Sequence, residues 1–282
     1  MTNPLIDQYA VFGNPIEQSR SPQIHSQFAK QTGEVLHYSR QRVELGGFVD
    51  SASAFFDAGG LGLNVTAPFK LEAFQFADEL TDRAQHAGAV NTLILRDSII
   101  IGDNTDGVGL VRDLTSNLIW PLEDRRMLLI GAGGAARGVI APILDERPSS
   151  LMIVNRTASK AEALAALFSA DAALNNSLIV AGGFELLLEE SGHYDVIINA
   201  SSTGFSGELP PVPDAIFSDT FCYDMMYAKA STAFLLRANQ LNSKGTADGL
   251  GMLVEQAAES FYLWRGKQPK TRALIDSLRQ EL

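Results

Sequence analysis

Lys70 has the surroundings expected of a residue that could transfer a proton. It ends the segment 62–70, in which an apolar strand runs up to Thr66 and is followed by Pro68, a residue suited to the first turn of a helix. Lys70 is therefore expected close to a helix N-terminus, where the partial positive charge and a dry cleft would disfavour the protonated amine and fit it for proton transfer. A solvated surface charge is the alternative that holds for most lysines.

Asp106 is a carboxylate in a turn-like segment, residues 102–107, that also contains Asn104 and Gly107. Because Asn, Asp and Gly dominate turns, turn formation alone would explain its presence. The residue pattern by itself does not pair Asp106 with Lys70, so both interpretations of each side chain stay open.

A glycine-rich turn follows the apolar strand expected at 127–130. Its pattern is Gly131-x-Gly133-x-x-Ala136, and the segment 135–144 is compatible with a helix. In a dinucleotide-binding fold the first glycine allows the tight turn, the second lets the backbone approach the pyrophosphate, and the small third residue permits close helix packing. An ordinary strand-to-helix turn is the alternative, but the flanking strand and helix favour cofactor binding.

The next strand, expected at 151–154, ends in Asn155, Arg156 and Thr157 instead of the acidic residue that usually binds the ribose of NAD. A carboxylate would repel a 2′-phosphate, whereas Arg156 offers a planar, permanently charged set of donors and Lys160 adds charge one turn later. NADP is therefore expected in preference to NAD. The alternative is that Asn155 and Thr157 cap the next helix and Arg156 is solvated.

Strand-like and helical segments alternate along the chain, which predicts an α/β fold with mainly parallel sheets. Two domains are expected for 282 residues: residues 1–106 plus 247–282, and a Rossmann-like NADP-binding domain at 107–246, with a cleft between them. Further strands are expected at 9–12, 62–65, 90–95, 99–101, 196–199 and 221–224. Helices are expected at 21–31, 108–118, 251–264 and 271–282, and a Gly-rich turn at 247–251.

The composition is that of a globular protein, with 46% hydrophobic and 20% charged residues. A net charge of -11 argues against nonspecific nucleic-acid binding, which needs basic surface. The chain has neither an apolar run near the ~18 residues of a membrane span nor a signal-peptide pattern at its start, so the cytoplasm is expected. The single cysteine, Cys222, is expected as a small buried hydrophobe without a catalytic role.

These motifs and several others resemble the shikimate dehydrogenase family along nearly the whole chain. Many matching blocks in the family's order are far more specific than any one of them. They are residues 11–16, 19–22, 64–70, 88–92, 102–107, 131–135, 155–157, 199–202 and 247–252.

The resemblance implies an NADP-dependent oxidoreductase of aromatic amino acid biosynthesis, in which the first domain binds the substrate and no metal takes part. Lys70 and Asp106 would form the catalytic pair, with Lys70 exchanging a proton with the reacting oxygen while hydride moves to or from the nicotinamide. The implied contacts to the substrate carboxylate and ring hydroxyls are Ser19, Ser21, Asn64, Thr66, Asn91, Asp106, Tyr227 and Gln256. The implied cofactor residues are Asp82, Gly131, Ala132, Gly133, Gly134, Ala135, Asn155, Arg156, Thr157, Lys160, Met225 and Gly249.

Two positions depart from the family pattern: Asp82 stands where many relatives have Glu, and Gln18 stands where the serine motif usually has His. The change at Gln18 removes a group that could titrate beside the carboxylate pocket, but it leaves both serines. For the substrate-binding residues, capping, turn formation, a solvated helix face or, for Tyr227, core packing are the alternatives that their residue types alone would favour.

Two rival functions remain. A quinate/shikimate dehydrogenase of looser specificity typically has an acidic residue before the arginine of the second strand, and Asn155 argues against it. A noncatalytic dinucleotide-binding regulator should have lost Lys70 or Asp106, and both are present. The expected partners are the small-molecule substrate, as 3-dehydroshikimate or shikimate, and NADP, for a protein that is a monomer or homodimer without nucleic-acid or membrane partners.

Overall fold

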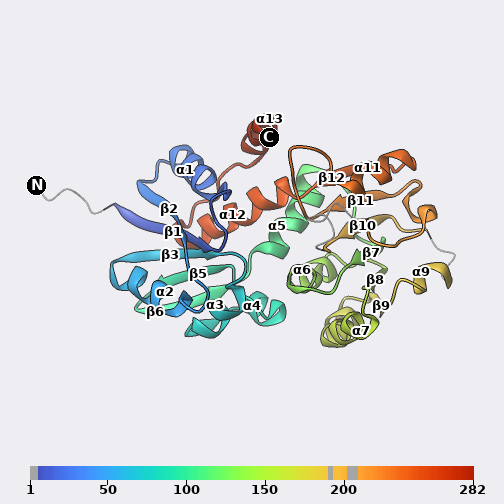
Figure 1. The fold of residues 1–282 in the computed structure, drawn as a ribbon, viewed down its shortest axis with the longest axis horizontal. Coiled ribbons are helices and arrows are strands. Elements are labelled where there is room, and N and C mark those ends of the chain that lie inside the picture. The colour runs from blue at the N-terminus through green and yellow to red at the C-terminus, as the bar shows by residue number, and fades with distance from the viewer. Residues whose placement is uncertain (1–5, 190–192, 202–208) are drawn as a thin grey trace, which may run out of the picture. The chain divides into compact units, whose positions relative to one another are not determined.

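The computed structural model describes residues 6–189, 193–201 and 209–282 (Figure 1). The chain divides into two compact units. The first contains the residues up to Gly109 together with Val254–Leu278, and the second contains Leu110–Leu253 with Arg279–Leu282. Each unit has its own six-stranded sheet, so the predicted α/β class is confirmed.

The sheet of the first unit is mixed. Its order is β2-β1-β3-β5-β6-β4, and its strands are β2 (Leu36–Arg42), β1 (Asp7–Gly13), β3 (Gly60–Val65), β5 (Thr92–Arg96), β6 (Ile99–Asp103) and β4 (Glu79–Leu80). β1 pairs in parallel with β2 and β3, whereas β5 is antiparallel to β3 and β6. A tight turn through Asp97 and Ser98, both at positive φ, joins β5 to β6, and such a short connection can join only antiparallel strands.

Alternate residues of β1 face opposite sides of this sheet, as the two-residue period of a strand requires. Ala10 and Phe12 pack into a core with residues of α2 (Phe48–Asp57), α3 (Lys70–Phe76) and α4 (Asp82–Ala87). Tyr9 lies on the other side and its ring contacts Trp264 of α12 (Leu250–Arg265), near α1 (Ser21–Thr32). Both faces of the sheet are therefore covered.

The sheet of the second unit is entirely parallel, in the order β12-β11-β10-β7-β8-β9. Numbered from its own first strand, this order is 6-5-4-1-2-3, which is the doubly wound dinucleotide-binding arrangement. Its strands are β7 (Arg126–Ile130), β8 (Ser150–Val154), β9 (Leu178–Gly182), β10 (Val196–Asn199), β11 (Phe221–Asp224) and β12 (Gly245–Asp248). The Rossmann-like prediction is thus confirmed.

Helices and short turns of the second unit connect these strands (Figure 1). They are α6 (Gly134–Asp145), α7 (Ala158–Leu167), α8 (Ser169–Leu174), α9 (Leu186–Glu189), a 3-10 turn at Asp214–Phe217 and α11 (Ala233–Gln240). Cys222 is buried in the sheet as expected, and burial raises the pKa of its thiol to about 12.

Four details of the sequence-based prediction were wrong. Strands β2, β4, β9 and β12 were not predicted, and β12 occupies part of the turn predicted at 247–251. β5 begins at Thr92, two residues after the predicted start, and the helix predicted at 108–118 is α5 (Asp106–Arg112) followed by a π-helical turn at Asp113–Asn117. Pro68 lies in a turn before α3 and not inside that helix. The two C-terminal helices, α12 and α13 (Arg272–Glu281), match their predicted ranges to within a residue.

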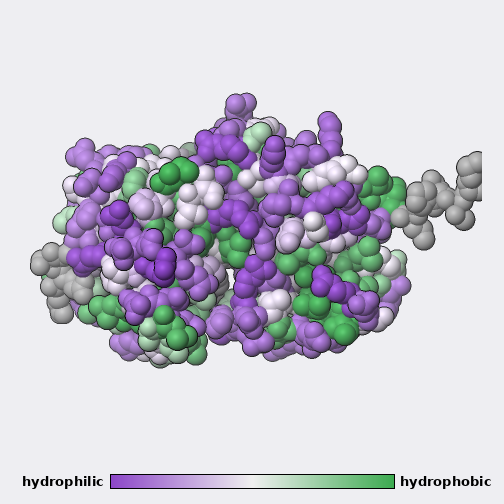
Figure 2. Space-filling view, turned by 180° about the vertical axis from the view of Figure 1, so that it is seen from behind, coloured by the Kyte–Doolittle hydropathy of each residue, from purple (hydrophilic) through white to green (hydrophobic). Residues whose placement is uncertain are grey.

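The face shown in Figure 2 is mainly hydrophilic, with hydrophobic residues exposed in several separate places. Within the ranges that the structure describes, no helix combines the length and the apolar character that a membrane crossing requires.

Candidate functional site

Lys70 and Asp106 meet in the first unit as an ion pair. Lys70 is the first residue of α3 and Asp106 is the first residue of α5, and 2.6 Å separates Lys70 Nζ from Asp106 Oδ2. The side chains are 32% and 15% exposed, so the pair is partly screened from water yet still accessible. The structure brings together the two residues that the residue pattern alone could not pair.

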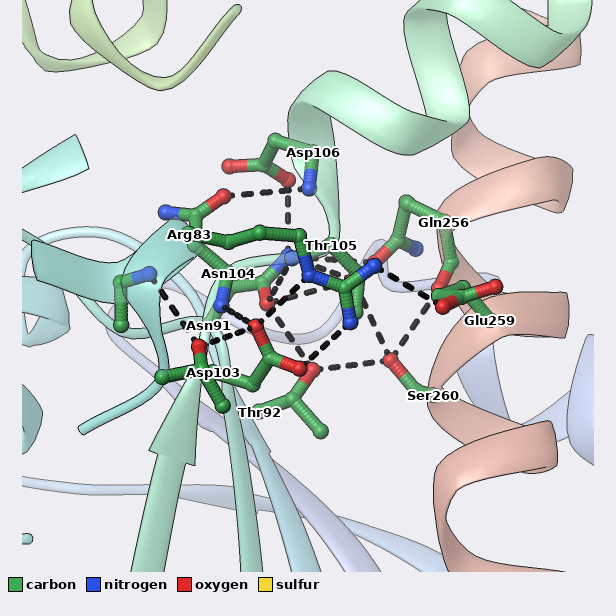
Figure 3. A network of polar contacts seen from close by, with 12 residues as sticks. Arg83, Asn91, Thr92, Asp103, Asn104, Thr105, Asp106, Gln256, Glu259 and Ser260 are labelled. Carbon is green, nitrogen blue, oxygen red and sulfur yellow. Dashed lines mark hydrogen bonds and ion pairs between the residues drawn. The ribbon is translucent and has the colours of Figure 1, made fainter. Parts of the chain in front are cut away.

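Asn91 holds the second oxygen of the same carboxylate (Figure 3). Its Nδ2 donates to Asp106 Oδ1 over 2.9 Å, and its Oδ1 accepts from the backbone N–H of Thr105 over 2.9 Å. Because a backbone N–H can only donate, Thr105 determines which end of the Asn91 amide faces Asp106. Gln256 Oε1 lies 3.5 Å from Asn91 Nδ2. Asn91, Asp106 and Gln256, all predicted substrate contacts, therefore lie in one network.

Three buried hydroxyl groups complete this network: Thr92, Thr105 and Ser260. Ser260 Oγ lies 2.8 Å from Thr92 Oγ1 and 3.3 Å from Thr105 Oγ1 (Figure 3). None of these three was predicted as a site residue. Thr92 and Thr105 adjoin Asn91 and Asp106 in the chain, and Ser260 lies four residues after Gln256, on the same face of a helix, so their spacing could have indicated them.

Asn64 is 7% exposed and uses both ends of its amide inside the protein. Its Oδ1 accepts from Tyr38 Oη over 2.7 Å, while its Nδ2 donates to Thr92 Oγ1 and Ser260 Oγ, each over 3.1 Å. Asn64 therefore belongs to the same hydrogen-bond network as Asn91. Its predicted role in substrate binding is a separate expectation from the family resemblance.

Ser19 and Ser21 are joined by a hydrogen bond at the start of α1, in which the Ser21 N–H donates to Ser19 Oγ over 3.3 Å. Arg40 Nη1 donates to the backbone carbonyls of Glu17, over 2.6 Å, and of Ser19, over 3.4 Å. A cavity of about 430 Å³ opens beside Ser19, and Gln18 is exposed in its wall. Ser19 and two cations, Arg20 and Arg40, line this cavity and could receive an anionic group, although Glu17 also lines it and Ser21 does not.

The remaining predicted substrate contacts lie in different parts of the fold. Thr66 directly follows β3, four residues before Lys70, and its N–H donates to Phe12 O over 2.9 Å. Tyr227 lies in the second unit, half-buried after β11.

His25 is fully buried, and its ring stacks at a centroid distance of 4.2 Å on that of Tyr38, the residue that donates to Asn64. Burial lowers the pKa of His25 from 6.5 to about 3, and the Asn64 side chain only partly opposes this effect. Burial likewise raises the pKa of Tyr38 well above 10. Both rings are therefore neutral near pH 7, and the Tyr38 hydroxyl keeps the proton that it donates to Asn64.

The lowered pKa of His25 predicts that the protein loses stability in acid. The folded ring excludes a proton that the unfolded chain binds below about pH 6.5, so the free energy of unfolding falls as the pH drops from 6.5 toward 3. Between pH 6.5 and about pH 5 this group alone is expected to cost up to about 2 kcal/mol. Urea unfolding at both pH values measures the loss, and the variant His25→Phe should lack this part of it. An unchanged pH dependence in that variant would contradict the assignment.

The glycine-rich loop of the second unit borders a cavity of about 490 Å³. Gly131 has φ +114, and an added Cβ would lie 3.1 Å from the Ala200 backbone, so a side chain is excluded there. Gly133 is the N-cap residue of α6, and Ala136 is fully buried against the sheet. The twelve-residue helix α6 thus directs its N-terminus at the cavity, as binding of a pyrophosphate requires.

The predicted cations line the same cavity. The described residues that line it include Arg156 and Lys160, both exposed, and no acidic side chain. Predicted cofactor residues among the lining are Gly131, Ala132, Gly133, Gly134, Ala135, Asn155, Arg156, Thr157 and Lys160. Such a site favours the ribose 2′-phosphate of NADP over the free ribose hydroxyl of NAD, which usually pairs with a carboxylate.

The predicted capping by side chains is not formed. Thr157 is the N-cap residue of α7, but its side chain makes no capping bond. Asn155 Nδ2 instead donates to Thr157 O over 3.0 Å. Asn155 therefore shapes the turn that carries Arg156.

Met225 and Gly249 approach each other closely at the ends of β11 and β12. A Cβ added to Gly249 would overlap the carbonyl oxygen of Met225, so only glycine fits. Asp82 belongs to the first unit, where it is the exposed first residue of α4 and does not line the cofactor cavity. Of the motif 199–202, Ser202 lies outside the described residues, whereas Asn199 Oδ1 accepts from Ser201 Oγ over 2.6 Å.

Family models match three parts of the chain. They describe the shikimate dehydrogenase substrate binding domain, over residues 11–93, shikimate/quinate 5-dehydrogenase, over residues 113–204, and the shikimate 5′-dehydrogenase C-terminal domain, over residues 249–279.

Individual relatives cover nearly the full length. A shikimate dehydrogenase (NADP(+)) from Chromobacterium violaceum is 51% identical, over 99% of this chain and 100% of the relative. The crystal structure of an Ael1 enzyme from Pseudomonas putida is similar with a TM-score of 0.89 and 42% identity, over 96% of this chain and 98% of that one. A shikimate 5-dehydrogenase from Thermus thermophilus, in complex with NADP(H) and shikimate, is similar with a TM-score of 0.84 and 28% identity, over 98% of this chain and 100% of that one. This chain belongs to the shikimate dehydrogenase family.

Proposed function

We propose that the protein catalyses the reversible, NADP-dependent reduction of 3-dehydroshikimate to shikimate, a step on the route to chorismate and the aromatic amino acids. The observation that carries this proposal is the ion pair of Lys70 and Asp106, 2.6 Å apart, at the edge of a network of amide and hydroxyl groups. Membership in a family whose named relatives use NADP(+) supports the same reaction.

Proton transfer falls to Lys70. NADPH, when bound, supplies the hydride for the ketone carbon. As the ketone becomes an alcohol, its oxygen gains negative charge, and the ammonium of Lys70 can donate a proton to it. Asp106 Oδ2 keeps Lys70 Nζ in place, and Asn91 keeps the carboxylate from turning. In the oxidative direction the amine of Lys70 accepts the proton of the alcohol.

The chemistry of the surrounding residues fits a polyhydroxylated acid. Asn91, Asp106 and Gln256 offer neutral and acidic acceptors and amide donors for ring hydroxyls, and Thr66 adds a further hydroxyl group. Tyr227 is proposed as an additional substrate contact on the family resemblance alone. Ser19 and Ser21 would hold the carboxylate. A site that hydrogen-bonds several hydroxyls rejects analogues that lack them, because its buried polar groups would then be unpaired.

The cofactor is assigned to the second unit. The backbone N–H groups at the start of α6 would take the pyrophosphate, and Arg156, with Asn155, Thr157 and Lys160, the 2′-phosphate. On the family resemblance alone, Met225 and Gly249 are proposed near the nicotinamide, and Asp82 is proposed as a further cofactor residue. In functional terms, residues 1–106 plus 247–282 would be the substrate domain and 107–246 the cofactor domain of a cytoplasmic monomer or homodimer.

Absorbance at 340 nm tests this function with purified protein. Shikimate and quinate are each supplied with NADP⁺ and with NAD⁺, and the pair of shikimate and NADP⁺ is expected to give by far the highest kcat/KM. Quinate turnover comparable to that of shikimate would favour the broader quinate/shikimate enzyme. Absence of turnover with all four pairs would exclude this enzymatic function.

A further inference from the structure

Three charged side chains meet behind the turn that carries Asp106: Arg83 of α4, Asp103 at the end of β6 and Glu259 of α12 (Figure 3). Arg83 binds Asp103 with two parallel hydrogen bonds, Nε to Oδ1 over 3.1 Å and Nη2 to Oδ2 over 2.5 Å. Its Nη1 donates to Glu259 Oε1 over 2.9 Å. One guanidinium thus joins three elements of the first unit.

Asp103 is only 1% exposed, and its Oδ1 also accepts from the protein backbone. The N–H of Asn104 donates to it over 2.7 Å, and Thr81 Oγ1 donates over 2.7 Å. Burying a carboxylate is costly unless it is paired and hydrogen-bonded, and Arg83 is the cation that pairs with Asp103 behind the turn.

Asn104 links Asp103 to the backbone of Asp106 through hydrogen bonds. Its Nδ2 donates to Ala89 O over 3.0 Å, and its Oδ1 accepts from the backbone N–H of Asp106 over 3.1 Å. A chain of hydrogen bonds therefore runs from Arg83 through Asp103 and Asn104 to the backbone of Asp106 (Figure 3).

We propose that Arg83 is a positioning residue for the catalytic turn, which it holds so that the carboxylate of Asp106 faces Lys70. This inference rests on the function proposed above for Lys70 and Asp106. Without the guanidinium, Asp103 must turn toward water or recruit it, and the N–H of Asn104 loses a fixed acceptor. Lysine cannot replace Arg83, because an ammonium lacks the planar fork that binds both oxygens of Asp103 while reaching Glu259.

The alternative is that the three charges merely stabilise the fold, and the chain offers a matched control for it. Arg265 of α12 also binds two carboxylates, those of Asp7 and Glu34, within the first unit. Its side chain is 19% exposed, against 31% for Arg83, and these partners lie at β1 and after α1, away from the turn at 103–106. The variants Arg83→Met and Arg265→Met therefore each remove an arginine with two acidic partners, but only the first loosens Asp106.

The experiment compares both variants and Arg83→Lys with the wild type, at a temperature where circular dichroism shows all of them folded. Urea unfolding gives stability, steady-state kinetics give kcat and KM, and NADPH deuterated at the transferred position gives the isotope effect on kcat. For Arg83→Met and Arg83→Lys we expect kcat to fall about tenfold or more, because small displacements of catalytic groups cost large factors in rate. We also expect a larger isotope effect and a KM for NADPH within about twofold of wild type. Arg265→Met should lose stability but keep its kcat.

An unchanged kcat in Arg83→Met, or an equal fall of kcat in Arg265→Met, would overturn the inference. If Arg83→Met does not fold, Glu259→Gln takes its place, because it removes one of the two carboxylates that orient the guanidinium and nearly preserves shape. Its kcat should fall several-fold with an unchanged KM for NADPH, and a wild-type kcat would overturn the proposal. If the wild type reduces 3-dehydroshikimate in the same assay, the proposed function stands, and such a result for the variants concerns the role of Arg83 alone.

Discussion

Replacement of Lys70 by alanine is expected to lower kcat by about 10²-fold or more, the usual effect of removing a general acid or base. The ammonium of Lys70 is the cation that pairs with the Asp106 carboxylate, and it lies at the partly accessible edge of the polar network. The KM for the substrate should change far less, because the hydroxyl-binding groups around Asn91 are untouched. Initial rates at 340 nm, with shikimate varied at saturating NADP⁺, measure both constants.

Lys30→Ala is the control for Lys70→Ala. Lys30 is an exposed lysine in the last turn of α1 of the same unit, and its loss should leave kcat unchanged. If Lys70→Ala raised KM and left kcat near the wild-type value, Lys70 would be a binding residue and not the acid/base. A second variant, Asp106→Asn, keeps the shape of the partner but removes its charge, and it should also lower kcat.

Replacement of Arg156 by alanine is expected to raise the KM for NADPH strongly and the KM for NADH little. Hydrogen bonds from a guanidinium to a charged group are worth roughly 1.5–3 kcal/mol, which corresponds to a factor of about 10 to 100 in affinity. Only NADPH carries the 2′-phosphate that such bonds would hold. KM values for both cofactors, measured at saturating 3-dehydroshikimate, test the prediction.

Arg147→Ala is the matched control for this variant. Arg147 lies in the same unit, is 63% exposed and pairs with Glu123, away from the residues that line the cofactor cavity. Its KM values for both cofactors should equal those of the wild type. Equal increases for NADPH and NADH in Arg156→Ala would show that Arg156 does not bind the 2′-phosphate.

Prediction from sequence was most successful where the signal is contiguous. The strand, glycine turn and helix from Arg126 to Asp145 follow one another directly, and each local preference agrees with the others. The buried central strands of the parallel sheet were also predicted, because they are short apolar runs. Edge strand β2 was missed because its residues are largely polar, which weakens the apolar pattern that identifies a strand. Edge strand β9 was missed although its residues form a short apolar run of the kind that indicates a buried strand.

The antiparallel pair β5 and β6 shows that strand direction is harder to predict from sequence than strand position. Their ranges were predicted approximately, but their direction was not, although a tight turn at Asp97 and Ser98 joins them. Alternation of strands and helices along a chain indicates parallel pairing only where a helix intervenes. The π-helical turn after α5 was not predicted from the sequence. Its first residue, Asp113, is buried and accepts a hydrogen bond from Tyr223 Oη over 2.8 Å.

The sequence alone predicts a cofactor site at the glycine loop and Arg156, because both would act through the backbone and charge of short local segments. It also contains the family motifs from which Lys70 and Asp106 were predicted as the catalytic pair. The folded chain was needed to show that Lys70 and Asp106 pair across 36 positions of the sequence, and that Asn64 donates a hydrogen bond to Ser260 across 196 positions. Such contacts arise when separate helices pack on one sheet, and the distance between two side chains then depends on every element between them.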